Sequence, residues 1–574
     1  MWVRFPPGSR FEFEFEFEFE FGFEGGAVRR VFSWRDVCFS RLLMTNSATK
    51  FRNEHAGEWS KCQLLAWDIL CPLFEDEAVS RVGVLRGFAG TGKTFWVAQV
   101  IRWLESEGWV VKVMTPTGRA AQVLNDRLVP YRVRAQVRTI HSAIYEVEPE
   151  DFSTNQLNLF AKTRTIQEEF PTVYVVDEAS MVGGIKSTQE ATGVKFGSGS
   201  ILHDLIEASC VASRSDVRML WIGDPAQLPP VSMFNQIAPA LDTTQLRKVL
   251  DEGGYVGDVL EAELRTVVRQ KEGPLVEFIS QIRTALELGE QLPKKGNNEV
   301  RRLDRDLFVT EYLKRTAFGR QPENAVVLAH SNVAVSAINT SIRNALGRTG
   351  VGLAEGELLL IKRNSVLSDF GDLEISGGKR ALRNGTFVVV HSEPRMLPKR
   401  MVRLNREEIN LEFWAVRIKP VGTSDILDVV ILKNYLDSDL NGGNSRKRSE
   451  LYSKLDTALL VDFQLRMREK RNLKPAKPGD EHYERYRTHA RSDPFLSALR
   501  VQYGYCVTVH NAQGGEWDTV FVDPASNHER EWQASPKHLY SFTRWVYTAS
   551  TRAKRDLWFI GAERLLAVDA EPQE

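Results

Sequence analysis

The sequence predicts an α/β protein built on parallel sheets, because apolar runs alternate with polar loops and helical patterns. Three such runs, at 82–85, 173–176 and 219–222, each lead directly into a loop that begins with Gly or Asp within two residues. A helical pattern over 95–104 follows the first loop, so strand, loop and helix occur in the order that a doubly wound sheet requires.

The first loop, 87–94, reads GFAGTGKT and matches the phosphate-binding pattern G-x-x-x-x-G-K-T. Glycines let the backbone curl with its N–H groups toward phosphate oxygens, and the following helix adds partial positive charge. Lys93 can reach the β- and γ-phosphates, and the Thr94 hydroxyl can ligate Mg²⁺. A chance glycine-rich turn is the alternative, but the Lys-Thr pair and the flanking elements favour a nucleoside triphosphate site. The other loop residues expected to bind the nucleotide are Gly87, Gly90, Thr91 and Gly92.

Two later strand ends carry groups suited to triphosphate hydrolysis. The run 173–176 leads into Asp177 and Glu178. Asp177 can hold Mg²⁺, directly or through water, and Glu178 can orient and deprotonate an attacking water. The third loop, GDPAQLPPV at 223–231, contains Gln227, whose amide can sense the γ-phosphate. A solvated acidic pair and a proline-rich turn would explain these loops singly, but their order behind 87–94 favours catalytic roles.

Together with further segments, these loops resemble the motifs of superfamily 1 helicases in the branch of the RecD-type enzymes and the phage Dda helicase, with a layout closest to Dda. The further segments are Gln63, TPTGRAA at 115–121, TIHS at 139–142, LRTVVRQ at 264–270, AHSN at 329–332, TVHNAQGGE at 508–516 and YTASTRAK at 547–554. The resemblance implies an ATP-dependent DNA helicase that moves 5′ to 3′ on single-stranded DNA and unwinds duplex. It also implies Mg²⁺ as metal and DNA single strands and duplex junctions as partners, with a single-stranded-DNA-binding protein as a further candidate.

The resemblance also implies the domain layout: two RecA-like motor domains with ATP between them, an inserted β-hairpin pin and an inserted SH3-like barrel. The first motor domain is expected at 44–290, with the pin at about 142–172. The second is expected at 324–345 and 499–568. The stretch 346–498 between these halves would hold the barrel, for which 387–390 and 413–418 are expected strands.

Several residue roles follow from the same resemblance. Arg269 and Arg552 are expected at the γ-phosphate, where arginine stabilises charge in the transition state, although surface ion pairs would also explain them. Gln63 would read adenine, and Glu516 would hold the ribose unless it is only a loop carboxylate. Phe160 resembles the aromatic tip of the pin, and packing in a small core is its alternative. The residues expected to contact DNA phosphates are Pro116, Thr117, His141, Thr508 and His510.

The charge composition does not reveal a nucleic-acid-binding surface for the chain as a whole. Lys and Arg total 75, as do Asp and Glu, so a basic nucleic-acid channel would have to be local. Residues 446–491 hold 13 Lys/Arg against 7 Asp/Glu, with Tyr483 and Tyr486 interleaved. That pattern suits either single-stranded DNA or a solvated helical face.

The remaining features concern location and the amino terminus. Five cysteines without paired spacing predict reduced thiols in a cytoplasmic protein, and no apolar run approaches the length of a membrane span. Residues 1–43, with Phe/Glu alternation over 11–21, are expected to be a mistranslated or non-native extension. An RNA-directed helicase of the same superfamily and an ATP-gated nucleic-acid-binding module are the competing functions.

Overall fold

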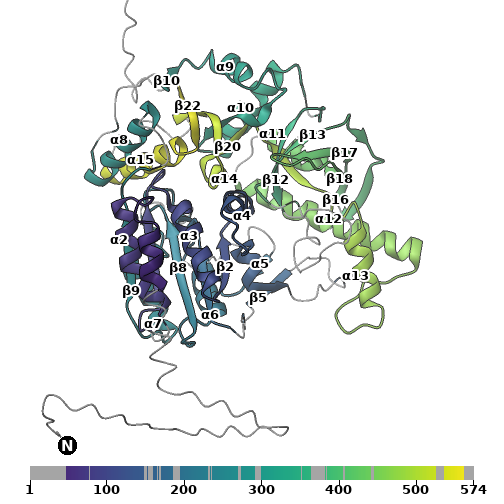
Figure 1. Cartoon of the computed structure of the whole chain (residues 1–574). Coiled ribbons are helices and arrows are strands. Elements are labelled where there is room, and N and C mark those ends of the chain that lie inside the picture. Colours follow the sequence, from purple (N-terminus) through teal and green to yellow (C-terminus); the bar gives the residue numbers. More distant parts are fainter. Residues whose placement is uncertain are drawn as a thin grey trace, which may run out of the picture.

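The structure is a computed structural model, and its described residues form two α/β units and a third unit (Figure 1). Figure 1 shows the first unit in purple and blue, the second in teal and yellow, and the third in green beside the second. The extension 1–43 lies outside the described residues. These are 47–75, 78–147, 152, 159–163, 166, 170–184, 194–230, 233, 236–268, 273–290, 292, 299–350, 352–363, 382, 384–404, 407–440, 445–524 and 535–561.

The first unit (61–264) is built on a parallel sheet of six strands in the order β3-β2-β6-β8-β1-β9. Successive residues of β8 alternate between two apolar clusters, because strand side chains point to opposite faces. Met219 and Trp221 join one cluster, and Leu220 and Ile222 join the other. The strands are β1 (Val82–Gly87), β2 (Val110–Thr115), β3 (Val137–Thr139), β6 (Thr172–Val176), β8 (Val217–Gly223) and β9 (Val259–Leu264).

Helices cover both faces of this sheet, as the α/β prediction requires. They are α2 (Lys61–Leu70), α3 (Lys93–Ser106), α4 (Gly118–Leu128), α5 (Ile140–Ile144), α6 (Ile201–Ser209) and α7 (Thr243–Glu252), with short 3-10 turns η1 (Cys71–Phe74), η2 (Val129–Tyr131) and η3 (Ala179–Met181). A separate small sheet joins β4 (Tyr145–Val147) antiparallel to β5 (Leu159–Thr163), which pairs parallel with β7 (Val194–Phe196).

The second unit (274–345 and 506–560) is a parallel sheet of five strands in the order β10-β22-β21-β11-β20. Its strands are β10 (Val300–Leu303), β11 (Ala325–Ala329), β20 (Cys506–Thr508), β21 (Trp517–Val522) and β22 (Ala553–Ile560). Its helices are α8 (Pro274–Leu288), α9 (Phe308–Arg315), α10 (Asn332–Ala345), α14 (Val509–Ala512) and α15 (Pro536–Ser550), with the turn η5 (Pro322–Asn324).

Helix α8 lies in the second unit, whereas we expected 44–290 to belong to the first. Its buried residues Phe278 and Ile282 share a cluster with Phe559 of β22, and it contacts α15 and β10. The apolar face of α8 therefore completes the core of the second sheet, and Figure 1 shows α8 next to α15. Sequence spacing alone does not show which of two sheets such a face covers.

The third unit (358–503) contains an antiparallel sheet and a helical insertion. The expected strands are present in β13 (Phe387–Val390) and β17 (Phe413–Pro420). The other strands are β12 (Leu358–Arg363), β14 (Arg395–Met396), β18 (Leu427–Leu432) and β19 (Arg500–Tyr503), beside the hairpin of β15 (Arg400–Leu404) and β16 (Glu407–Leu411). Three helices follow β18: α11 (Lys433–Leu440), α12 (Ser445–Arg471) and α13 (Tyr483–Ser492).

The tyrosines of the basic stretch are core residues, so they do not form an aromatic surface for DNA. Tyr483 and Tyr486 are 5% and 0% exposed, and both share an apolar cluster with Phe463 of α12. Phe152, from the first unit, lies in the same cluster. Helical spacing turns these tyrosines inward, as the helical interpretation of 446–491 requires. Basic residues such as Arg468 and Arg471 are exposed, whereas Asp456 and Asp462 are buried.

Candidate nucleotide site at the interface of two units

The loop 87–94 connects β1 to α3 and has the geometry of an anion cradle. Gly90 and Gly92 have φ of 81° and 79°, a left-handed conformation that favours glycine. Thr91 is buried, and its hydroxyl donates to the carbonyl oxygen of Phe88 at 2.8 Å. The helix then begins at Lys93 with Gly92 as its N-cap. The curled backbone and the helix start together favour bound phosphate.

The reactive side chains of this loop lie at the start of α3. The Lys93 ammonium donates to the carbonyl oxygens of Gly87 and Phe88 at 2.6 and 2.9 Å. These bonds hold the ammonium group against the loop. Thr94 is half-buried in the first turn of the helix.

Gln63 braces the same loop from α2. Its side-chain oxygen accepts from the Ser60 N–H at 2.9 Å, and its nitrogen donates to the Thr91 carbonyl at 3.3 Å. A Cβ on Gly92 would lie 2.6 Å from that nitrogen, so the contact is close. Both ends of the Gln63 amide are thus engaged, and the side chain would have to release one of them to bind a base.

The acidic pair follows β6 next to this loop. Asp177 donates its backbone N–H to Met114 at 2.9 Å, and its carboxylate accepts from the Glu178 N–H at 2.8 Å. Burial and the neighbouring Glu178 raise the pKa of Asp177, while the charge of Lys93 opposes that rise. Glu178 has φ of 55°, which is uncommon for a residue with a side chain. This turn directs two successive carboxylates to the end of one strand.

The loop after β8 is gripped by helix α15 of the second unit. Arg544 donates to the carbonyl oxygens of Pro225 and Gln227 at 3.0 and 2.5 Å. The Thr548 hydroxyl accepts from the Leu228 N–H at 2.9 Å. Residues 544 and 548 are one helical turn apart and therefore share a face. The side-chain oxygen of Gln227 is buried and, within the described chain, has no hydrogen-bond partner.

Tyr547 on the same helix joins two loops of the first unit. Its hydroxyl donates to Asp224 at 2.8 Å and accepts from the Ala89 N–H of the phosphate loop at 3.2 Å. Tyr547 is fully buried. From α8, the Arg283 guanidinium lies 3.5 Å from the ring centre of Phe88 in the same loop. The nucleotide loop is therefore covered by the second unit.

Arg552 and Glu516, two of the residues predicted at the nucleotide, have other partners in the structure. Arg552 is 5% exposed and donates to the Thr548 carbonyl at 3.1 Å and the Thr551 hydroxyl at 2.9 Å. Glu516 forms an ion pair with Arg127 at 2.6 Å. Each would have to leave these partners to contact a nucleotide. Arg269 lies outside the described residues, but Val268 just before it donates to the Gly90 carbonyl at 2.9 Å, which brings that segment to the phosphate loop.

The residues expected to contact DNA lie at strand ends that begin helices. Thr117 caps α4 by accepting from the Ala120 N–H at 3.2 Å, and Thr508 caps α14 by accepting from Asn511 at 3.4 Å. Pro116 precedes Thr117 at the end of β2. Phe160 lies in β5, where its backbone pairs with Lys195, and its side chain lies outside the described part.

The two expected DNA-contacting histidines are held neutral. Burial lowers the pKa of His141 to about 4. Burial and the nearby His330 lower the pKa of His510 to about 4 as well. At neutral pH neither ring carries a positive charge, so their use toward phosphate would be hydrogen bonding rather than charge attraction.

Sequence reasoning did not assign roles to Tyr547, Arg544 or Arg119, although each lies in or next to a quoted segment. The Arg119 guanidinium lies 4.6 Å from the ring centre of Phe387 and 4.1 Å from that of Trp517. These rings belong to the third and second units, so Arg119 of α4 contacts both. The position of Arg119 in the segment TPTGRAA could have pointed to a role. Its partners could not be predicted, because they are far away in the sequence.

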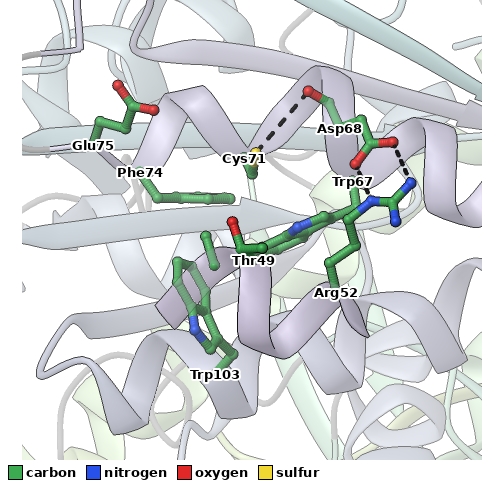
Figure 2. Close-up of a pocket in the computed structure, with 9 residues that line it drawn as sticks. Thr49, Arg52, Trp67, Asp68, Cys71, Phe74, Glu75 and Trp103 are labelled. Carbon is green, nitrogen blue, oxygen red and sulfur yellow. Dashed lines mark hydrogen bonds and ion pairs between the residues drawn. The ribbon is translucent and has the colours of Figure 1, made fainter. Parts of the chain in front are cut away.

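A pocket, drawn in Figure 2, lies at the end of α3 away from the phosphate loop. Trp67 and Trp103 line it, and Arg52 pairs with Asp68 at 2.5 and 2.8 Å at its edge. Burial raises the pKa of the Cys71 thiol to about 11, so this thiol is unreactive. Trp103 is ten residues along α3 from Lys93, or about 15 Å of helix, so this pocket is separate from the phosphate loop.

Two family models match the units just described. The AAA domain matches 75–192, which includes the phosphate loop and the acidic pair, and the UvrD-like helicase C-terminal domain matches 503–560, which includes α15. Both matches agree with the expected class, a P-loop enzyme of the helicase type. No helix in the described ranges is long and apolar enough to cross a membrane.

The individual proteins that this chain resembles share little sequence identity with it. An uncharacterized protein of Methanocaldococcus jannaschii is 21% identical over 511 residues, which are 85% of this chain and 37% of that protein, so this chain spans well under half of its length. The Pif1 helicase from Bacteroides in complex with ADP-AlF3 and ssDNA is 14% identical, with 87% of this chain and 92% of that chain covered and a TM-score of 0.38. The Pif1 helicase from Candida albicans is 13% identical, with 88% and 94% covered and a TM-score of 0.36. Scores this low do not by themselves establish a shared fold, and the expected closeness to Dda stays a prediction.

Proposed function

We propose that this chain is an ATP-dependent DNA helicase that moves 5′ to 3′ on single-stranded DNA and unwinds duplex. The observation that carries the proposal is the contact of α15 with the catalytic loops. Arg544, Tyr547 and Thr548 bind loops of the first unit that contain the phosphate cradle and Gln227. A site divided between two parallel-sheet units can convert nucleotide turnover into relative motion of those units.

The residues present fit ATP and Mg²⁺. The left-handed Gly90 and Gly92 shape a backbone cradle, and the charge of Lys93 is near enough to Asp177 to affect its pKa. Within the described ranges, no cluster of His, Cys, Asp or Glu forms a protein-only metal site. Mg²⁺ at a triphosphate keeps water and phosphate ligands and needs only one or two protein oxygens, which Thr94 and Asp177 would supply. When bound, the metal neutralises developing charge on the phosphates.

The side chains of this chain then have separable tasks in hydrolysis. Glu178 orients a water molecule and accepts its proton. Lys93 stabilises negative charge at the phosphate end of the loop. Arg552 and Arg269 would stabilise charge at the γ-phosphate, and Gln227 would supply its buried amide oxygen, which has no hydrogen-bond partner in the described chain. Gln63 and Glu516 bind the nucleoside after release of their present partners.

DNA contact is proposed along the strand ends that carry Pro116, Thr117, His141, Thr508 and His510. Hydroxyls and helix starts bind phosphates without reading bases, which suits movement along any sequence. The β4–β5 pair with Phe160 would be the duplex-splitting pin, the third unit would act as the SH3-like subdomain, and a single-stranded-DNA-binding protein is a candidate partner. These assignments rest on the motif resemblance, as does the direction of movement.

Strand displacement on forked substrates tests the function directly. Three duplex substrates are compared at equal ATP concentration: DNA with a 5′ single-stranded tail, DNA with a 3′ tail, and the same duplex made of RNA strands. The Glu178→Gln variant is the control. We expect unwinding of the 5′-tailed DNA fork alone, and Glu178→Gln should bind ATP without turnover. A preference for the 3′ tail would overturn the direction, and a preference for RNA would favour the RNA-directed helicase. ATP-dependent binding without hydrolysis would indicate an ATP-gated binding module.

A further inference from the structure

Tyr547 of the second unit bonds to the backbone of the phosphate-binding loop. The Ala89 N–H, inside the loop 87–94, donates to the Tyr547 hydroxyl at 3.2 Å. Backbone N–H groups of such loops are the donors that cradle phosphates. A single N–H cannot make a well-aligned bond to the hydroxyl and to a phosphate oxygen at the same time.

The same hydroxyl is tied to the loop that contains Gln227. It donates to Asp224, which is 1% exposed, at 2.8 Å. Burial and the Asp224 charge raise the pKa of Tyr547 well above its ordinary value, so the hydroxyl keeps its proton for this bond. Asp224 in turn accepts from the Ala226 N–H at 2.9 Å. A movement of the Tyr547 hydroxyl would therefore be transmitted through Asp224 to the backbone of the loop that contains Gln227.

We propose that Tyr547 is a positioning residue whose hydroxyl competes with a nucleotide phosphate for the Ala89 N–H and so reports occupancy of the phosphate loop to the second unit. Loss of the Ala89 bond frees the hydroxyl at one end while Arg544 and Thr548, on the same face of α15, stay attached to 225–228. Nucleotide binding thus changes one bond within a three-residue contact. The inference rests on the proposed function, because it assumes that the loop binds a nucleotide.

Equilibrium binding of Mg²⁺-ADP and of a non-hydrolysable ATP analogue to the full chain, without DNA, tests this competition. Tyr547→Phe keeps the buried ring and removes the hydroxyl, so the Ala89 N–H becomes available. We expect about two- to tenfold tighter nucleotide binding, the range for one competing hydrogen bond, together with a lower DNA-stimulated turnover rate. This split, with a lower KM and a lower kcat, is not expected from simple loss of stability.

Two matched variants separate competition from loosening of the interface. Thr548→Val removes the neighbouring α15 contact to Leu228 without touching the phosphate loop, and should lower turnover with no gain in affinity. Tyr503→Phe removes the hydroxyl of another buried tyrosine, which donates to the Gly352 carbonyl at 2.7 Å and does not contact the phosphate loop. This variant should change neither nucleotide affinity nor turnover. Unchanged or weaker binding in Tyr547→Phe, or equal tightening in Thr548→Val, would overturn the inference. If the unaltered chain binds no nucleotide, the proposed function itself fails.

Discussion

Phe152 connects the insertion of the first unit to the helices of the third, and its truncation is expected to separate them. The side chain is fully buried, and its ring centre lies 5.2 Å from that of Tyr486 and 6.3 Å from that of Tyr483. Its backbone N–H donates to the Ala476 carbonyl at 2.9 Å, and its carbonyl accepts from Gln464 at 2.8 Å. A side-chain change leaves these backbone groups in place, so they report on docking.

Truncation of a buried Phe costs about 3–5 kcal/mol. The ring of Phe152 packs against residues of another unit, so we expect most of this cost to fall on docking rather than on global unfolding. A loss of about 3 kcal/mol lowers the ratio of docked to undocked chains by about a hundredfold. Hydrogen exchange at the residue 152 amide should then speed up by a similar factor in Phe152→Ala.

The assay pairs this exchange measurement with unwinding and with DNA-stimulated ATPase. Because the insertion carries the proposed pin, unwinding should fall more than ATPase does. Phe170→Ala is the control, since Phe170 lies just before β6 and its side chain is 61% exposed. Wild-type exchange at residue 152 together with normal unwinding in Phe152→Ala would refute the reasoning.

Four further changes have expected outcomes. Lys93→Ala should abolish ATP hydrolysis in a phosphate-release assay, because the phosphate loop loses its point charge, and retained turnover would contradict the site. Phe160→Ala should slow fork unwinding and spare DNA-stimulated ATPase, whereas equal loss of both would place Phe160 in a core. Arg119→Lys keeps the charge but loses the planar stacking between Phe387 and Trp517, so calorimetry should show a lower unfolding temperature. The pKa of His141 is lowered to about 4 by burial, below the usual value of about 6.5; the unfolded chain therefore binds the extra proton, and stability should fall as pH drops from about 6.5 to 4, less so in His141→Gln.

Local chemistry could be predicted from the sequence because its parts are contiguous. The cradle of 87–94 and the pair Asp177–Glu178 each lie at the end of one apolar strand, and the structure places both as that pattern indicates. The parallel α/β class follows from the same strand–loop–helix order, and β13 and β17 follow from their local patterns. Such patterns involve only a few consecutive residues, so they can be recognised without knowing which distant residues pack against them.

Tertiary structure alone decided which distant groups meet. Ala89 and Asp224 are 458 and 323 residues from Tyr547, and their shared hydroxyl depends on how the second unit returns to the first. The burial of Tyr486 in a charged stretch, and the covering of a second sheet by α8, likewise depend on which apolar face finds which partner. Apolar burial is not directional, so a sequence shows that a helix face must be covered, while only the packed chain determines what covers it.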